Sequence, residues 1–190
     1  MATPKDIIND EIQFLKEIGT KLSDFEEVPN EKEKFTLLGK GNFGYVEKMK
    51  SKKDSKFYAI KKLDINSQKF KIKDFKRETK IMKDLNHENI IKLYGYFIDK
   101  EDKDKYSKIY KKDKPEDKEI VCLVLEYAEN GSLENYMEKC KQKFKDEHEY
   151  VPIKEKIVIK IFKQLLCAIK YLHSKSIMHR DIKPDNILYG

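Results

Sequence analysis

Three residues near the C-terminus have the types and the spacing for chemistry on a charged group. The run HRDIKPDNIL, residues 179–188, brings Asp181, Lys183 and Asn186 together within a few positions. A carboxylate can accept a proton, an ammonium group can neutralise negative charge, and an amide oxygen can bind a metal ion. A short loop that follows a buried helix can present all three groups at one point. The sequence therefore indicates a reaction centre in this loop.

A cluster of glycines marks a second candidate site. Gly39, Gly41 and Gly44 lie in the run LGKGNFGYV and are three of the seven glycines in the chain. Glycine lets backbone N–H groups approach a phosphate without interference from a Cβ atom. Dinucleotide-binding units share this spacing, with Asp64 near the place of their ribose-binding acid, but in them a helix follows the glycines. Residues 45–62 favour instead a strand–turn–strand, which is either a phosphate loop or an ordinary glycine hairpin.

Lys61, in the run YAIK, is a third candidate. Because side chains alternate along a strand, Lys61 and Ala59 should share one face while Ile60 and Lys62 point to the other. A small residue beside the lysine leaves room for a flat ring, and the ammonium group can reach phosphates. Such a lysine needs a fixed partner, and Glu78 in the following helix is the candidate. Taken alone, either charge is more often a solvated one in so charged a chain.

Together these motifs resemble the signature set of the eukaryotic protein kinases. Between about Leu38 and Leu188 the chain contains, in the family's order, G-x-G-x-x-G-x-V, A-x-K, a helical Glu and H-R-D-x-K-P-x-N. The resemblance implies an ATP site in which the glycines cover the phosphates with Phe43 at their tip, while Lys61, held by Glu78, binds the α- and β-phosphates. The residues implied for ATP binding are Leu38, Gly39, Gly41, Phe43, Gly44, Val46, Ala59, Lys61, Glu78, Leu125, Glu126, Ala128 and Leu188.

The run VLEYAENGSL resembles the hinge between the two lobes of such kinases. The resemblance gives Leu125 the gatekeeper place and implies that backbone groups of Glu126 and Ala128 hydrogen-bond the adenine. The apolar residues implied above and below the adenine ring are Val46, Ala59 and Leu188.

In the catalytic loop the resemblance makes Asp181 the acceptor of the substrate hydroxyl's proton, Lys183 the cation at the γ-phosphate and Asn186 a magnesium ligand. Lys183 followed by Pro184 is the serine/threonine-type spelling, so the implied reaction is phosphoryl transfer from Mg-ATP to a protein Ser or Thr hydroxyl. ATP, Mg2+, a protein substrate and a regulatory partner are therefore expected. The run ENYMEKCKQKF and the residues leading into the loop look similar, more narrowly, to the NIMA-related kinases.

Hydrophobic periodicity predicts the elements that position these motifs. Residues 35–62 alternate like strands around the glycine turn; a helix and two further strands follow, at residues 72–85, 89–98 and 119–128. A helix begins after its predicted cap Ser132, and residues 152–173 form the strongest helix, whose apolar face must be buried. The order predicts an α+β, kinase-like fold: an antiparallel-sheet N-lobe, then the first helices and catalytic loop of an incomplete helical C-lobe.

We divide the chain into three parts. Residues 1–34 are an N-terminal amphipathic helix and linker, residues 35–128 the N-lobe and hinge, and residues 129–190 the partial C-lobe. The apolar stripe expected to pack on the domain or on a partner consists of Ile8, Ile12, Leu15, Ile18 and Leu22. Within the N-lobe, residues 99–119 carry eight lysines and eight acids. They predict a solvated insertion loop, with a docking or regulatory loop as the alternative.

The composition argues against other classes of protein. The net charge is +7, but only Arg77 and Arg180 of 41 basic residues are arginine, which disfavours a nucleic-acid-binding protein. An odd number of cysteines, three, indicates reduced and mostly buried thiols, and no Cys/His spacing indicates zinc. The sequence has no secretory signal and no apolar run of membrane-spanning length, so we expect a cytoplasmic or nuclear protein.

One element of the kinase pattern is not among these 190 residues. It is the Asp-Phe-Gly element, whose Asp holds the main magnesium ion in the family. We expect a piece of a longer kinase, inactive by itself, because every ATP-site and catalytic-loop residue that it could contain is present. The alternatives are a short non-catalytic module that binds nucleotide or a partner, and an interaction protein driven by its N-terminal helix.

Overall fold

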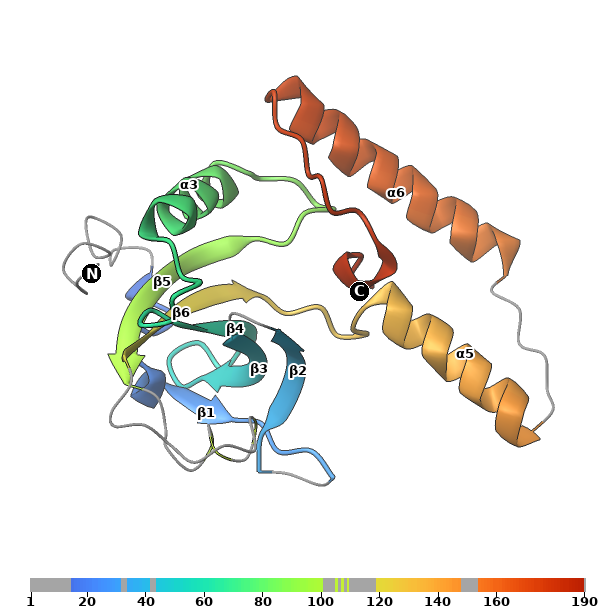
Figure 1. Ribbon diagram of the computed structural model, residues 1–190. Helices are drawn as coiled ribbons and strands as arrows, with labels where there is room; N and C mark the ends of the chain where they lie inside the picture. The colour runs from blue at the N-terminus through green and yellow to red at the C-terminus, as the bar shows by residue number, and fades with distance from the viewer. Residues whose placement is uncertain are drawn as a thin grey trace. The chain divides into compact units, whose positions relative to one another are not determined.

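The computed structural model divides into two units, Met1–Leu85 with Ile91–Tyr127 and Asn86–Ile90 with Ala128–Gly190. The first unit is a β-sheet with one long helix, and the second is mainly helical, which confirms the predicted α+β fold class (Figure 1). The structure describes residues 15–31, 34–41, 44–100, 105, 107, 109, 119–147 and 154–189.

One six-stranded antiparallel sheet forms the first unit. Its strands run in the order β1-β3-β4-β6-β5, and β2 also pairs with β3, at the end that β1 leaves open. The strands expected from the alternating pattern are confirmed, whereas β1 was not predicted. The strands are β1 (Phe25–Glu27), β2 (Thr36–Gly41), β3 (Gly44–Ser51), β4 (Phe57–Asp64), β5 (Leu93–Lys100) and β6 (Glu119–Glu126).

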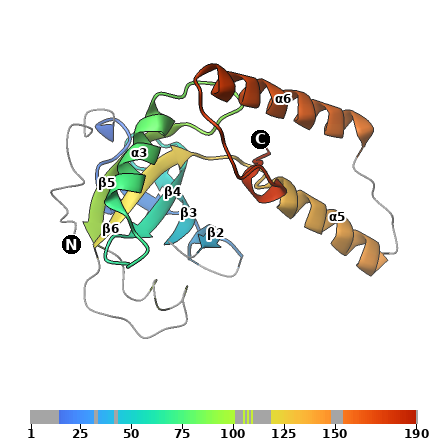
Figure 2. The ribbon, with the colours of Figure 1, turned by 45° about the horizontal axis from the view of Figure 1, so that its top comes forward.

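Helix α3 (Ile72–Lys83) lies along one face of this sheet, as Figure 2 shows. Its buried Phe75 packs edge-on against Tyr96 of β5, with the ring centroids 5.0 Å apart. Val121 and Leu123 of β6 complete the apolar layer beneath the helix. The helix predicted for residues 72–85 is therefore confirmed.

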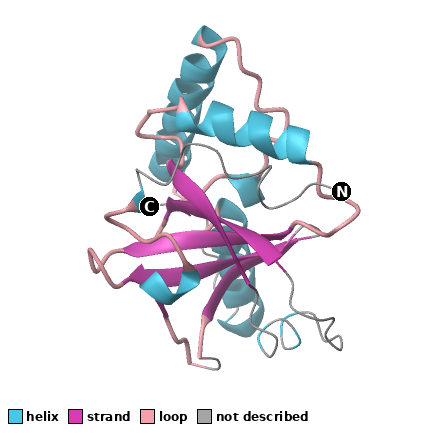
Figure 3. Ribbon diagram, turned by 90° about the vertical axis from the view of Figure 1, so that its left-hand side faces the viewer, coloured by secondary structure: helices cyan, strands magenta, loops and turns pink. Residues whose placement is uncertain are grey.

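The opposite face of the sheet is covered by the segment that precedes the glycine hairpin. Leu15 is only 1% exposed and packs, with Ile18 and Phe25, into the same core as Ile60 of β4. Gly95 makes room for Leu15: its φ is +153°, and a Cβ atom there would come within 3.0 Å of Leu15 Cγ. The sheet, magenta in Figure 3, thus has a hydrophobic core on each of its two faces.

This segment is the described part of the predicted N-terminal helix. The stripe residues Leu15, Ile18 and Leu22 all pack against the sheet core. The predicted helix is wrong for residues 16–22, because residues 16–18 form a turn and Leu22–Asp24 form a single 3-10 turn, η1, that leads into β1. The rest of the predicted helix, residues 1–14, lies outside the described residues. These three residues therefore pack on their own domain, which was one of the two predicted roles of the stripe.

The connection between β5 and β6 differs from its prediction at two positions. The prediction of a solvated loop is wrong for Lys105 and Ile109, whose side chains are only 6% and 8% exposed. Lys105 is buried because two carboxylates, those of Glu27 and Glu47, meet its ammonium group. An interleaved charge pattern cannot distinguish a lysine in solvent from one aimed at a buried acid.

The second unit contains α5 (Leu133–Glu147), α6 (Glu155–Ser174) and the 3-10 turn η2 (Pro184–Asn186). Ser132 caps α5 as predicted: its Oγ accepts from Asn135 N–H at 3.1 Å, and Asn135 Oδ1 accepts from Ser132 N–H at 3.0 Å. This reciprocal arrangement satisfies backbone donors that the first turn of a helix leaves unpaired.

The prediction that the whole apolar face of α6 is buried is wrong. Ala168 and Leu172 are buried, but Phe162 is 57% exposed and Leu166 61% exposed. The contacts of α6 concentrate near its C-terminal end, where Tyr171 lies 5.0 Å from the His87 ring and its hydroxyl accepts from Asn86 N–H. The described residues leave more than half of the Phe162 and Leu166 surfaces uncovered.

All three cysteines are free thiols. Only Cys122 is buried, whereas Cys140 is half-buried and Cys167 exposed, so the prediction of mostly buried thiols is wrong. Cys167 lies on the uncovered part of α6. In the part of the chain that the structure describes, no helix has both the length and the apolar character of a membrane span.

We predict that Leu15→Ala lowers the free energy of unfolding by about 2–4 kcal/mol, because it leaves a cavity between the N-terminal segment and β5. Leu37→Ala is the matched control; Leu37 is 39% exposed, and we expect a loss below about 1 kcal/mol there. Urea unfolding followed by circular dichroism measures both. Equal losses for the two variants would contradict the docking of Leu15 in the core.

Candidate functional site

The glycine run forms the tight end of an antiparallel hairpin. Gly39 pairs with Val46 and Gly41 with Gly44, so a strand follows the glycines. This confirms the predicted strand–turn–strand and excludes the dinucleotide-binding alternative, which needs a helix there. Residues 42 and 43, and with them the predicted site residue Phe43, lie outside the described residues.

The three glycines have different structural requirements. Gly44 has a φ of +153°, and a Cβ atom on it would lie 1.8 Å from the carbonyl oxygen of Lys62. Around Gly39 no atom of the described residues lies within 4 Å of such a Cβ position, and at Gly41 the nearest of their atoms is 3.9 Å away. The fold therefore requires glycine at 44 only. Glycines that the fold does not require suit a backbone that a ligand approaches closely, and a phosphate fits this description.

Lys61 lies on the opposite face of the sheet from its neighbour Lys62. It pairs with Val46 across β3, and Ala59 pairs with Leu125 across β6. Because directly paired residues project from the same face, these four side chains lie on one side of the sheet. Lys61 is exposed there, while Lys62 is 4% exposed on the other side. The alternation predicted for this strand is confirmed.

The predicted ion pair between Lys61 and Glu78 is not formed. Both side chains are exposed, and the ion pairs among the described residues do not include one between them. The buried side of α3 carries Phe75 and Thr79, which leaves Glu78 at the edge of the packed surface. Two solvated charges gain little from pairing, so nothing in this arrangement draws them together.

The predicted hinge begins where β6 ends. Glu126 N–H donates to the carbonyl oxygen of Lys92 at 2.9 Å, and Glu126 Oε2 accepts from Lys92 N–H at 3.1 Å. These bonds fix the end of β6 to the start of β5. Among the other predicted residues, Leu38 is exposed on β2, and Ala128 belongs to the second unit.

In the second unit the structure brings Asp181, Lys183 and Asn186 together. Lys183 Nζ lies 3.2 Å from Asp181 Oδ2, and Asn186 Nδ2 donates both to that oxygen, at 2.8 Å, and to the Asp181 carbonyl, at 2.9 Å. The turn η2 makes this geometry possible because it folds residue 186 back over residue 181. The predicted convergence of acid, cation and amide in one loop is therefore present.

This loop is anchored to the start of α5. Leu133 N–H donates to Ile187 O at 2.8 Å, Tyr189 N–H donates to Gly131 O at 2.8 Å, and Leu188 forms a bridge with Ser132. Figure 1 shows η2 at the N-terminal end of α5. The backbone thus holds the three polar side chains in place from behind, while all three remain exposed.

The electrostatics of the loop favour the ionised carboxylate. The hydrogen bond from Lys183 and the second from Asn186 hold the pKa of Asp181 below its ordinary value, because both donors stabilise the charged form. The amide of Asn186 uses its nitrogen for these bonds, and its oxygen is the atom type that Mg2+ prefers. Among the described residues, no group of three or more His, Cys, Asp and Glu side chains is placed to hold a metal ion.

Sequence reasoning missed the buried charges behind the hairpin. Glu47 of β3 is completely buried, and Lys62 of β4 meets it at 2.8 Å. The signal was present in the alternation: Glu47 lies between Tyr45 and Met49, two residues on the face that the pattern assigns to the core. A charge in a buried position of a strand predicts a partner of opposite sign.

We predict that Lys183→Met raises the pKa of Asp181 toward its ordinary value, because it removes the stronger of the two donors. Asn186→Leu should raise it less. Titration of the Asp181 carboxyl by carbon NMR measures both, and Lys175→Met, which loses the same charge outside the loop, should leave it unchanged. A response to Lys175→Met as large as that to Lys183→Met would contradict the local cause.

Comparison with known proteins finds relatives over most of this chain. The chain is 37% identical over 184 residues to calcium-dependent protein kinase 5 of Plasmodium falciparum, which covers 95% of the chain and 26% of that protein. It is 35% identical over 156 residues to the Aurora kinase of Schizosaccharomyces pombe, covering 80% of the chain and 36% of that protein. The interferon-induced, double-stranded RNA-activated protein kinase of Rattus norvegicus is 31% identical over 166 residues, covering 86% of the chain and 28% of that protein.

The chain thus spans about a quarter to just over a third of the length of these relatives. Their names do not include a NIMA-related kinase, so that narrower resemblance stays a prediction. The family model described as the protein kinase domain matches residues 32–190, which include the glycine hairpin, Lys61 and the whole catalytic loop. This chain belongs to the protein kinase family.

Proposed function

We propose that this chain is the ATP-binding and catalytic-loop part of a protein serine/threonine kinase. Such an enzyme transfers the γ-phosphoryl group of Mg-ATP to the hydroxyl of a Ser or Thr in a protein. The observation that carries the proposal is the catalytic loop, in which Lys183 and Asn186 both contact Asp181. A proton acceptor, a cation and an amide oxygen within one short loop are the parts that phosphoryl transfer needs from its enzyme.

The first unit supplies the groups for the nucleotide. Gly39 and Gly41, which the fold does not require to be glycine, let backbone N–H groups approach the phosphates. Lys61 binds the α- and β-phosphates from the face that it shares with Ala59, which is small enough to leave room for the adenine ring. The carbonyl of Glu126 meets the adenine, since the N–H of that residue already donates to Lys92.

The second unit supplies the groups for the reaction. When bound, Mg2+ neutralises charge on the phosphates. Asn186 holds it through Oδ1, while Nδ2 keeps the Asp181 carboxylate oriented. Asp181 accepts the hydroxyl proton of the substrate, and its bonds with Lys183 and Asn186 favour the ionised form that can accept it. Lys183 balances the charge of the transferred group.

Catalysis by these groups requires Lys61 and Asp181 to face one triphosphate. We propose that Glu78 pairs with Lys61 in the complex with nucleotide, because bound phosphates hold the ammonium group in an extended position that a helical carboxylate can meet. We place the protein substrate and a regulatory partner in the cytoplasm, because free thiols are usual in proteins of that compartment.

A second candidate function is a non-catalytic module that binds nucleotide or a partner. The exposed Phe162 and Leu166 on α6 favour it, since apolar side chains of this size commonly mark a contact surface. The two functions differ in phosphate transfer, which only the first includes.

We predict that Gly39→Ala and Gly41→Ala leave the free energy of unfolding within about 1 kcal/mol but weaken nucleotide binding about tenfold or more, because each Cβ occupies space needed by the phosphates. Gly44→Ala should instead destabilise the hairpin, since its Cβ would overlap a backbone carbonyl. Thermal unfolding and titration with a fluorescent ATP analogue in Mg2+ separate the effects. Unchanged nucleotide affinity in the first two variants would contradict the phosphate site.

We predict that Lys61→Met and Asp181→Asn each abolish phosphotransfer, by at least about a hundredfold, with the fold retained. The assay is radiolabelled transfer from ATP to a Ser/Thr protein substrate, in the kinase that contains these residues. Asp185→Asn is the control, because Asp185 is an exposed acid of the same loop, whereas the described bonds to the Asp181 carboxylate come from Lys183 and Asn186. Near wild-type turnover in either test variant would show that its assigned role is wrong.

A further inference from the structure

We propose that Lys105 and Ile109, from the connection between β5 and β6, are positioning residues for the glycine hairpin, residues 36–51. They hold it from the face opposite Lys61. This inference rests on the proposed function, because the hairpin is taken to be the cover of the ATP phosphates. Neither residue belongs to the expected ATP site, and the sequence alone suggested that both lie in a solvated loop.

The first step is the demand for positive charge at the centre of β3. Glu47 is 0% exposed, and each of its carboxylate oxygens meets a different lysine: Oε2 lies 2.8 Å from Lys62 Nζ, and Oε1 lies 2.6 Å from Lys105 Nζ. A buried carboxylate that loses one partner is strongly destabilised. Lys62 comes from the neighbouring strand, so Lys105 is the partner that fastens a distant segment onto the hairpin.

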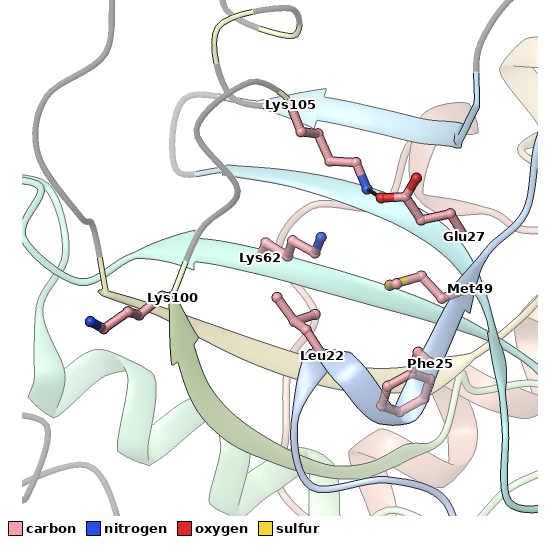
Figure 4. Close-up of a pocket in the computed structure, with 7 residues that line it drawn as sticks. All are labelled: Leu22, Phe25, Glu27, Met49, Lys62, Lys100 and Lys105. Carbon is pink, nitrogen blue, oxygen red and sulfur yellow. Dashed lines mark hydrogen bonds and ion pairs between the residues drawn. The ribbon is translucent and has the colours of Figure 1, made fainter.

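The second step is the set of contacts that the Lys105 side chain makes. Figure 4 shows its side chain reaching toward Glu27 of β1, with which it also forms an ion pair, while Lys62 points into the same space. A cavity of about 270 Å³ lies beside this cluster, with Phe25 and Met49 among its apolar lining residues. The ammonium group also lies 4.8 Å from the centre of the Phe35 ring, at the start of the hairpin. Lys105 therefore connects β1, β3 and the residue that precedes β2.

The third step is a separate apolar contact at the tighter end of the hairpin. Ile109 packs with Phe35 and Tyr45 in a small core of its own, and all three side chains are buried. Phe35 precedes β2 and Tyr45 follows Gly44, so this contact reaches the start of β2 and the glycine end of β3. The carbonyl oxygen of Ile109 also accepts from Lys40 Nζ at 2.8 Å, and Lys40 lies between Gly39 and Gly41.

These contacts restrain the hairpin without blocking the nucleotide face. Tyr45 and Glu47 project from β3 on the side away from Val46, which pairs with Lys61. A hairpin held from behind is already ordered when a nucleotide arrives, and a ligand that need not order its own site binds more tightly. Release of Lys105 or Ile109 should therefore loosen the hairpin first and weaken nucleotide binding as a result.

Hydrogen–deuterium exchange of the full 190-residue chain tests the restraint without any nucleotide. We expect Lys105→Met and Ile109→Ser to speed amide exchange in residues 36–51 about tenfold and to leave the backbone of β5 and β6 protected. Ile109→Val, which keeps an apolar side chain, and Lys76→Met, which removes an exposed lysine from α3, should resemble the wild type. Unchanged exchange in the hairpin, or equal acceleration throughout the sheet, would overturn the proposal.

Titration with a fluorescent ATP analogue in Mg2+ then tests the consequence. We expect the dissociation constant to rise about three- to tenfold in Lys105→Met and Ile109→Ser, and to stay unchanged in Ile109→Val. A loosened hairpin with undiminished affinity would overturn the positioning role. If the wild-type chain binds no nucleotide, the proposed function fails, and the exchange experiment still decides whether the two residues hold the hairpin.

Discussion

A carboxylate with no access to water needs positive charge beside it, and the Glu47 side chain imposes this condition on the whole first unit. Lys62 supplies this positive charge from the next strand, and its ion pair with Glu47 fixes the register between β3 and β4. Lys105 supplies a second positive charge from the connection between β5 and β6, and it also forms an ion pair with Glu27. One acid thereby links β1, the glycine hairpin, β4 and the distant Lys105.

The same constraint gives the two faces of the hairpin different roles: one face holds the fold together, and the other is expected to bind the nucleotide. Alternation sends Tyr45 and Glu47 toward the covering N-terminal segment, and it leaves Val46 and Lys61 on the other side. The glycines differ in a similar way. The turn requires glycine at position 44, whereas the fold leaves room for a Cβ atom at positions 39 and 41. Mutations on the two faces of the hairpin should consequently differ in kind, with losses of folding on the face of Glu47 and losses of ligand binding on the face of Val46.

Local pattern predicted much of this molecule. Period-two alternation placed Lys61 correctly, and the catalytic loop was recognisable because its residues are close in sequence. The predictions that failed concern contacts between residues that are far apart in the sequence. The Lys105–Glu47 pair joins residues 58 positions apart, and no charge pattern specifies which of many lysines is buried. The distance between Lys61 and Glu78 depends on how α3 is set against the sheet, which helical spacing does not determine. Exposure of Phe162 depends on what else packs against α6.

The adjacent lysines of β4 show how far neighbours in one strand can diverge. Lys61 projects into solvent, and Lys62 is sealed between Glu47 and the Tyr45 ring. An acylating reagent that modifies only unprotonated, accessible amines will therefore discriminate between two side chains that share a peptide bond. Occupancy of the phosphate site would shield the first from the reagent, and only unfolding would uncover the second, so a single peptide could report both events.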